Sequence, residues 1–291
     1  VILCGVGGVE AQTETVWQQC RKYHVPALAF VNKLDRPGAD FASVVNQIRE
    51  RLEAQPLPVQ TPYYEQDAFR GVIDLVDMRL LVWEDTLGAT IEVMDIPEDR
   101  RPEAENARDA MLERLADLDD AVMELYLAGG DIEPDLVRRT VRRLTIEERI
   151  VPVLCGSALR NKGIQPLVDA VVDYLPSPLE AKPVQAHRRD GREAVNISSD
   201  PKGPLVAYVF KVYMDEGRRM VYLRIYSGTL KVGDEVYNVT RGVTEKIARL
   251  FSMHAHVKQR IESASAGDIV AAVGLKESVT GDTLTRGVDN V

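Results

Sequence analysis

No stretch of this 291-residue sequence approaches about 18 consecutive apolar residues, and no basic, apolar signal segment opens it. We therefore expect a soluble protein of the cytoplasm, without a membrane partner. The three cysteines, Cys4, Cys20 and Cys155, are odd in number and lack C-x-x-C spacing. They predict buried thiols in a reducing compartment rather than disulfides or a zinc site. Of the four histidines only His254 and His256 lie close together in the sequence, and no cysteine lies near them, so we expect no metal site there.

The sequence also lacks a phosphate-binding loop. It contains no G-x-x-x-x-G-K-[ST] run and no Gly-Lys dipeptide. In nucleoside triphosphatases the backbone N–H groups of that loop, its lysine and a Ser or Thr on Mg²⁺ hold the phosphates. We therefore predict that this chain holds no catalytic residue and no metal ligand for nucleotide hydrolysis.

Charge is unevenly distributed around a net value of −9. Residues 187–291 carry 16 Lys and Arg against 13 Asp and Glu, whereas the preceding residues carry 20 against 32. An acidic first part argues against broad, nonspecific binding of nucleic acid. Any contact with RNA is expected to be local and to lie on the second part.

Two short polar motifs follow apolar runs that are typical of buried strands. Asn32-Lys33-Leu34-Asp35 follows the run at 25–31, and Ser157-Ala158-Leu159 comes just after the run at 150–155. Ligands bind parallel sheets at the carboxyl ends of their strands. Asp35 can accept from both N1–H and the 2-amine of guanine, a charge-assisted pair that adenine cannot offer. The two motifs together predict the guanine-reading loops of a GTPase.

Within these loops each residue type has an expected task. Asn32 would tie the two loops together, and the stem of Lys33 would lie along the ring of the base. The backbone N–H groups of Ser157 and Ala158 would point at guanine O6. A D-x-x-G run at 85–88 follows the first loop, whereas the metal and γ-phosphate switch of GTPases precedes it. We do not expect this run to be a switch.

Strands and amphipathic helices alternate in the first part. Helical spacing of apolar residues over 13–23, 40–54 and 164–175 predicts helices that cover a parallel sheet. Residues 62–148 interrupt this alternation with short strands at 69–77 and 78–83, a helix at 103–128 broken near Asp119, and a helix from Pro134. After residue 204, short strands and Gly-containing turns predict a closed antiparallel barrel.

The expected fold class is therefore α/β and β. It combines an incomplete P-loop-GTPase-type parallel sheet, an inserted α+β subdomain and an antiparallel β-barrel of the translation-factor type. The predicted limits are 1–61 and 149–186 for the two parts of the GTPase domain, 62–148 for the inserted subdomain, and 187–291 for the barrel.

Along nearly its whole length the chain resembles translation elongation factor G. The stretches that carry the resemblance are GVEAQTETVW at 8–17, NKLDRPGAD at 32–40, GSALRNKGIQ at 156–165, DYLPSP at 173–178, and, in the barrel, 226–230, 249–255 and 281–284. The resemblance implies a cytoplasmic GTPase that moves tRNA and mRNA through the ribosome. It implies GTP or GDP as nucleotide, with Mg²⁺ ligands outside this chain. The guanine contacts it implies are Asn32, Lys33, Asp35, Ser157, Ala158 and Leu159.

The chain begins without Met inside a predicted strand at 1–4, so we expect a piece of a larger protein. Alone, that piece is expected to bind no nucleotide and to be inactive. A sibling translational GTPase, such as release factor 3 or a ribosome-protection protein, is an alternative, although Met253-His254-Ala255 and the long insertion favour elongation factor G. A second alternative is a binding module whose insertion docks the acidic ribosomal stalk protein and whose barrel touches ribosomal RNA. The arginines at 138, 139, 142 and 143 favour an exposed helix face over a binding site.

Overall fold

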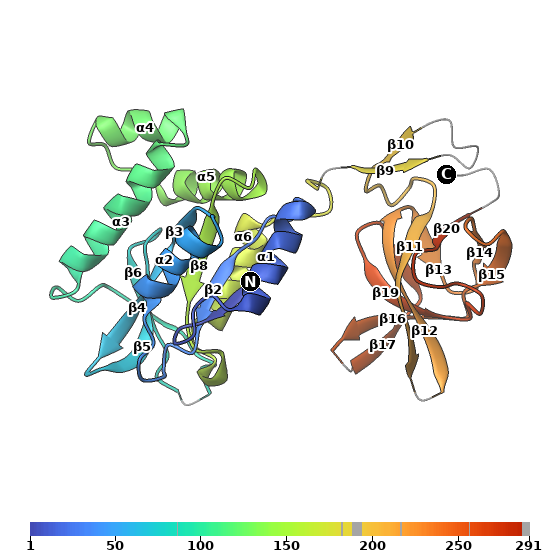
Figure 1. Cartoon of the computed structure of the whole chain (residues 1–291), viewed down its shortest axis with the longest axis horizontal. Coiled ribbons are helices and arrows are strands. Elements are labelled where there is room, and N and C mark those ends of the chain that lie inside the picture. The colour runs from blue at the N-terminus through green and yellow to red at the C-terminus, as the bar shows by residue number, and fades with distance from the viewer. Residues whose placement is uncertain (86, 182, 188–193, 216, 256, 287–291) are drawn as a thin grey trace. The chain divides into compact units, whose positions relative to one another are not determined.

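The computed structural model describes residues 1–85, 87–181, 183–187, 194–215, 217–255 and 257–286. Thr86 of the D-x-x-G run, His256 and residues 188–193 of the predicted barrel domain lie outside the described residues. The chain divides into two compact units, Val1–Pro176 and Ser177–Val291, whereas the sequence placed the start of the barrel domain at 187 (Figure 1). Among the described residues, no helix combines the length and apolar character needed to cross a membrane.

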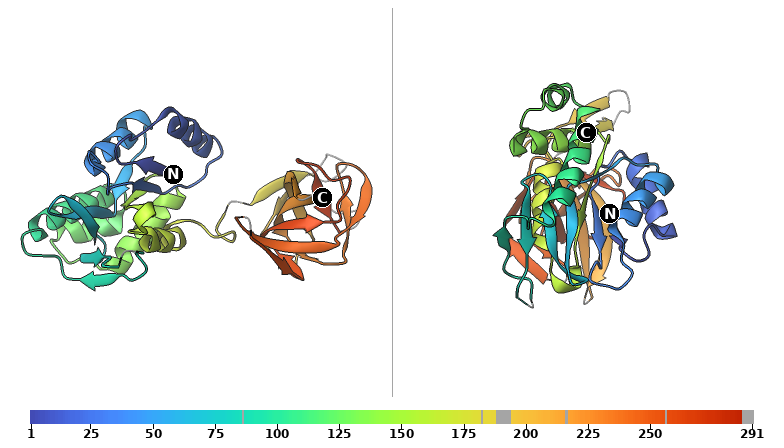
Figure 2. Two further views of the ribbon diagram at one scale, coloured as in Figure 1. Left: turned by 90° about the horizontal axis from the view of Figure 1, so that it is seen from below. Right: turned by 90° about the vertical axis from the view of Figure 1, so that its left-hand side faces the viewer.

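A four-stranded parallel sheet forms the centre of the first unit. Its strand order is β1-β2-β8-β3, with bounds Ile2–Cys4, Ala29–Asn32, Val151–Cys155 and Pro56–Pro58. Helices α1 (Ala11–Lys22) and α2 (Phe41–Arg51) lie on one side and α6 (Ile164–Tyr174) on the other (Figure 2). Successive residues of β8 therefore face different cores: Val153 and Cys155 pack with α1 and α2, and Leu154 packs with α6. The predicted α/β layering is confirmed.

Strand β3 was not predicted. Two of its three residues are proline, and Pro56 comes just after the predicted helix at 40–54, where proline is typical of a helix end. Proline lacks the N–H that a central strand donates on both sides, but it is tolerated at a sheet edge. β3 occupies that edge position and pairs in parallel with β8, from Pro56 opposite Val151 to Pro58 opposite Val153.

The insertion consists of an antiparallel sheet and three helices. The sheet is β4-β5-β6-β7, and the bounds are Gln60–Glu65, Ala68–Asp74, Arg79–Val82 and Glu92–Met94 for the strands, then Arg101–Ala116, Asp120–Leu127 and Pro134–Ile146 for α3, α4 and α5. The predicted break near Asp119 is confirmed, since the Asp119 carboxylate accepts from Val122 N at 2.8 Å and caps α4.

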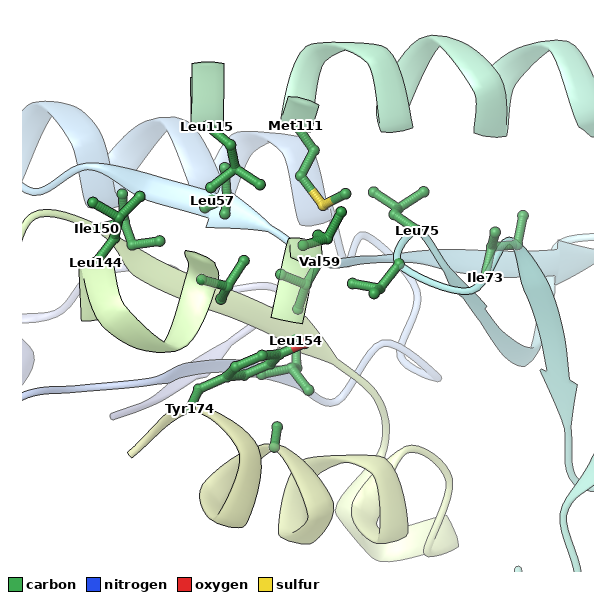
Figure 3. Packing of buried hydrophobic residues seen from close by; sticks show 14 of the residues in the cluster. Leu57, Val59, Ile73, Leu75, Met111, Leu115, Leu144, Ile150, Leu154 and Tyr174 are labelled. Atoms are coloured by element: carbon green, nitrogen blue, oxygen red, sulfur yellow. The ribbon is translucent and has the colours of Figure 1, made fainter. Parts of the chain in front are cut away.

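The insertion shares its core with the parallel sheet. Figure 3 shows Leu115 of α3 close to Leu57 of β3 and Met111 of α3 close to Val59, with Tyr174 of α6 beside Leu154. These side chains belong to one continuous buried cluster, which also takes in Leu144 of α5. The insertion is therefore anchored to the sheet that carries the two predicted loops.

The second unit is an antiparallel β structure. Eight strands follow the order β15-β14-β20-β11-β12-β19-β16-β17, and their bounds are Val243–Lys246, Glu235–Asn238, Thr283–Thr285, Val206–Asp215, Arg218–Ser227, Ile269–Val273, Arg249–His254 and Val257–Ile261. Two further pairs are β13 (Thr229–Lys231) with β18 (Ser263–Ser265) and β9 (Val184–His187) with β10 (Ala194–Ile197). The inward side chains of these strands form a separate apolar core, as the barrel prediction requires.

Candidate functional site

The two polar motifs meet at the carboxyl edge of the parallel sheet because β2 and β8 are hydrogen-bonded neighbours. The Asn32 side-chain oxygen Oδ1 accepts from the backbone N–H of Ala158 at 2.9 Å. Leu34 N donates to Gly156 O at 3.2 Å and adds a backbone link. The prediction that Asn32 ties the loops together is confirmed.

The Asp35 carboxylate is held by the second loop. Its Oδ1 accepts from the Ser157 hydroxyl at 2.7 Å, and its Oδ2 lies 3.8 Å from Arg160 Nε. The Ser157 residue is fully buried, whereas the Asp35 side chain is 24% exposed. A carboxylate has about four acceptor positions, so Asp35 keeps capacity for further donors from solvent or a ligand. From the sequence we expect Ser157 to act only through its backbone N–H, and the contact between its hydroxyl and Asp35 is not predicted.

Lys33 occupies an unusual backbone conformation between these residues. Its φ is 66°, in the left-handed region, and its N–H donates to Asn32 Oδ1 at 2.7 Å. Such a conformation in a residue with a side chain costs on the order of 1–3 kcal/mol and persists where surrounding contacts fix it. Here the two hydrogen bonds to Asn32 fix it, and the Lys33 side chain is exposed at the mouth of the site.

The backbone of the second loop differs from the expectation. Ser157 N donates to Lys162 O at 2.9 Å, and Ala158 N donates to Asn32, so both N–H groups are engaged within the loops rather than directed outward. Ala158 begins a short 3-10 helix, Ala158–Arg160, and the Leu159 residue is 86% exposed on it. Sequence alone could not foresee these partners, because they depend on how the loop closes.

Two glycines allow this loop to close tightly. Gly163 has φ of 84°, and a Cβ built there would lie 2.5 Å from Cys155 O. A Cβ on Gly156 would lie 2.3 Å from Lys162 O.

Burial lowers the pKa of the Lys162 ammonium, and the neighbouring Arg70 and Arg160 lower it further.

The inserted subdomain braces the second loop through the D-x-x-G run. The Gly88 carbonyl accepts from Asn161 Nδ2 at 2.9 Å and from Gln165 Nε2 at 2.7 Å. Trp83, only 1% exposed, donates its Nε1–H to Gln165 Oε1 at 3.2 Å. The brace therefore runs from the end of β6 to the start of α6.

The Asp85 carboxylate stabilises a turn in the segment that contacts the second loop. This carboxylate accepts from the backbone N–H groups of Leu87, Ala89 and Thr90 at 2.8–3.0 Å. Hydrogen bonds from Ala89 and Thr90 hold the pKa of Asp85 below its usual value. The contacts of this run among the described residues are those of a structural turn.

Three of the four arginines of the run on α5 form structural contacts, and Arg139 is exposed. Arg138 pairs with Asp77, and Arg143 pairs with Asp119 at 2.5 Å. Arg142 donates to the Val172 carbonyl at 2.9 Å, near the carboxyl end of α6. These contacts support the interpretation of the arginine run as a helix face rather than a binding site.

Among the described residues, no group of three or more His, Cys, Asp and Glu side chains is arranged to hold a metal ion.

Comparison with known proteins agrees with this geometry. Residues 1–177 match the family model described as the elongation factor Tu GTP binding domain, and residues 218–285 match elongation factor Tu domain 2. Relatives include elongation factor G 2 of Syntrophus aciditrophicus (48% identical over 285 residues), elongation factor G of Thermotoga maritima (49% over 278) and elongation factor G 1 of Geobacter sulfurreducens (50% over 285).

These matches cover 95–98% of this chain and 40–42% of the relatives, so the chain spans about two fifths of their length. A crystal structure titled ttk003000868, from Thermus thermophilus, superposes with a TM-score of 0.79 at 26% identity. That match covers 98% of this chain and 40% of the other. The resemblance to elongation factor G is confirmed by the relatives' names. The chain belongs to the family that carries the elongation factor Tu GTP-binding domain.

Proposed function

We propose that this chain supplies the guanine-reading half of the nucleotide site, the insertion and the second domain of a ribosome-dependent GTPase of the elongation factor G type. The complete protein would hydrolyse GTP to promote movement of tRNA and mRNA during protein synthesis in the cytoplasm. The observation that carries the proposal is the Asn32–Ala158 hydrogen bond, which sets Asp35 and Ser157 side by side at one sheet edge.

The residues present suit a guanine base. The Ser157 hydroxyl fixes Asp35 Oδ1, and Oδ2 lies 3.8 Å from Arg160 Nε in a side chain that is 24% exposed. The carboxylate thus keeps acceptor capacity for the N1–H and 2-amine of guanine. Lys33 would cover one face of the ring with its stem. For guanine O6 to be bound by the Ala158 N–H, that group would share or exchange its bond to Asn32, a small adjustment within the loop.

A bound nucleotide would bring the reactive γ-phosphate, but this sequence contains no phosphate loop to hold it. The roles of Asn32, Lys33, Asp35, Ser157, Ala158 and Leu159 are therefore base recognition and loop support. A site that depends on such polar contacts rejects a base that leaves them unpaired. We assign these six residues to guanine selectivity and none of them to bond breaking.

The outer face of β11 and β12 supports contact with ribosomal RNA. Lys211 Nζ lies 5.7 Å from the ring centroids of both Tyr213 and Tyr222, and Phe210 meets Tyr222 edge-to-face at 6.2 Å. Phe210 is 38% exposed. Aromatic side chains interleaved with basic ones provide stacking and phosphate contacts for RNA. The excess of Lys and Arg after residue 187 supports the same surface.

The inserted subdomain offers a different kind of surface. Helix α4 exposes Met123 and Leu127, which lie one turn apart on the same face, and Leu127 is 78% exposed. Clustered exposed apolar side chains are typical of protein-binding sites. We assign this helix to docking of the acidic ribosomal stalk protein, which would meet apolar side chains there.

The complete protein tests the proposal. GTP hydrolysis should be stimulated by ribosomes, and ATP should neither be hydrolysed nor compete. A double substitution Lys211→Ala/Tyr222→Ala should weaken ribosome binding, whereas Lys202→Ala, a change at an exposed lysine outside that face, should not. Ribosome-independent hydrolysis, or hydrolysis of ATP at the same rate, would rule out the proposed function.

A further inference from the structure

A groove of about 370 Å³ lies between α6, α5 and the antiparallel sheet of the insertion, away from the two guanine loops. Its polar lining is largely acidic and comes from different elements: Asp74 and Asp77 lie at and just after the end of β5, and Asp169 and Asp173 belong to α6. The buried Tyr174 also lines it. None of these groups has a part in base recognition.

The first observation that points to a ligand is an unpaired acceptor. Gln60, the first residue of β4, lines the groove and is only 2% exposed. Its side-chain oxygen Oε1 is buried and accepts no hydrogen bond from the described residues. A buried polar atom without a partner is unfavourable, so a group that donates to it would be bound favourably.

The second observation is uncompensated negative charge. Two cations also line the groove, but Arg138 pairs with Asp77 and Arg79 pairs with Asp95. Within the described part of the chain, the carboxylates at 169 and 173 form no ion pair, and Asp74 shares the charge of Arg138 with Asp77. Those at 169 and 173 are four residues apart on α6, a spacing at which like charges destabilise a helix.

Asp74, at the end of β5, also lines the groove, and its Oδ1 accepts from Val76 N and Asp77 N. Burial raises the pKa of its carboxyl, although backbone N–H groups of Asp77 and Val76 act in the opposite direction. A cation placed beside it would offset the loss of hydration. The groove thus combines a buried acceptor, a partly buried carboxyl and two solvent-facing carboxylates.

We propose that this groove binds an alkylammonium group, with Gln60 Oε1 accepting one N–H and the carboxylates of Asp74, Asp169 and Asp173 surrounding the charge. An ammonium carries three N–H donors and no acceptor, and it is compact enough for the groove. Acceptors spread over three elements suit this tetrahedral donor better than the planar fork of a guanidinium. The group can come from a free polyamine or from a lysine side chain of another polypeptide.

Calorimetric titration of this chain at low ionic strength tests the site. The probes are spermidine, a peptide with a single lysine, and tetramethylammonium, which has the charge but no N–H. We expect saturable binding of one equivalent of spermidine or of the lysine peptide, and at least tenfold weaker binding of tetramethylammonium. The tighter of the first two identifies the source of the group, and either result supports the site.

Two variants separate binding from folding. Gln60→Met removes the unpaired acceptor at nearly constant volume, so amine affinity should fall at least tenfold while the melting temperature stays level or rises. Asp169→Asn/Asp173→Asn should weaken binding similarly. Glu105→Gln/Glu113→Gln removes the same charge from the exposed face of α3 and should change affinity less than twofold. Unsaturable binding, or equal losses in all variants, would overturn the proposal.

Discussion

The hydroxyl of Ser157 fixes the Asp35 carboxylate, and Ser157→Ala should show what that contact contributes. The hydrogen bond is 2.7 Å long, joins residues 122 positions apart, and has a fully buried donor. Hydrogen bonds to charged groups contribute about 1.5–3 kcal/mol. The Asp35 side chain is 24% exposed and can regain water, so we expect a loss near the lower end, about 1–2 kcal/mol.

The assay has two parts. In this chain, thermal unfolding of the first unit should move down by about 2–8 °C, given about 2–4 °C per kcal/mol for a domain of this size. In the complete protein, the preference for GDP over IDP, which lacks the 2-amine, should fall by about threefold to tenfold. That preference reports how well Asp35 is aimed at the base.

Thr145→Ala is a matched control. Thr145 is fully buried and donates its hydroxyl to Val141 O at 2.7 Å, on a helix of the insertion rather than in either loop. It should cost a similar amount of stability and leave the GDP preference unchanged. If Ser157→Ala keeps both the stability and the GDP preference of the parent protein, the hydroxyl does not position Asp35.

Three further outcomes are expected. This chain alone should release no phosphate from GTP above background and should bind no fluorescent GDP at micromolar concentrations, because it lacks a phosphate loop; saturable release that survives repurification would contradict this. Gly163→Ala should destabilise the first unit by at least about 2 kcal/mol more than Gly129→Ala in chemical denaturation, since both have positive φ but only Gly163 lacks room for a Cβ; equal losses would argue against the tight loop. The pKa of Asp85 is depressed on folding, so its contribution to stability is present above the unfolded-state pKa and is lost as pH falls through the lower folded value. NMR titration should place the Asp85 pKa below the usual value of a solvent-exposed aspartate, because backbone N–H groups donate to its carboxylate, and a normal value would refute the turn geometry.

The sequence predicted the parts of the fold that have a strong periodic signal. Helical apolar spacing located α2 and α6 to within a few residues, and the position of Asp119 located the break between α3 and α4. Strand β3 was not predicted, because its prolines are typical of a helix end. Proline is tolerated in this strand only because β3 lies at the edge of the sheet. Local pattern does not contain that information.

The candidate site was predictable in its residues but not in its contacts. Asn32 and Asp35 are fixed by a motif and its place after a strand. The Ser157 hydroxyl contact, the engaged Ala158 N–H and the brace from Gly88 to Gln165 join positions 73–126 apart or depend on loop closure. Such pairings arise from tertiary packing, and a single sequence carries no signal for them.

Asp35→Asn in the complete protein tests the central claim most directly. In the proposed site the carboxylate would accept from two guanine donors, whereas the amide would keep one acceptor and gain a donor that suits the 2-carbonyl of xanthine. Folding stability should fall by about 1 kcal/mol, because the amide oxygen can still accept from the Ser157 hydroxyl but no longer carries a charge. We expect GTP binding to weaken at least tenfold, XTP binding to strengthen, and ribosome-stimulated turnover to return with XTP. A normally folded variant that still prefers GTP over XTP would show that Asp35 does not read the base.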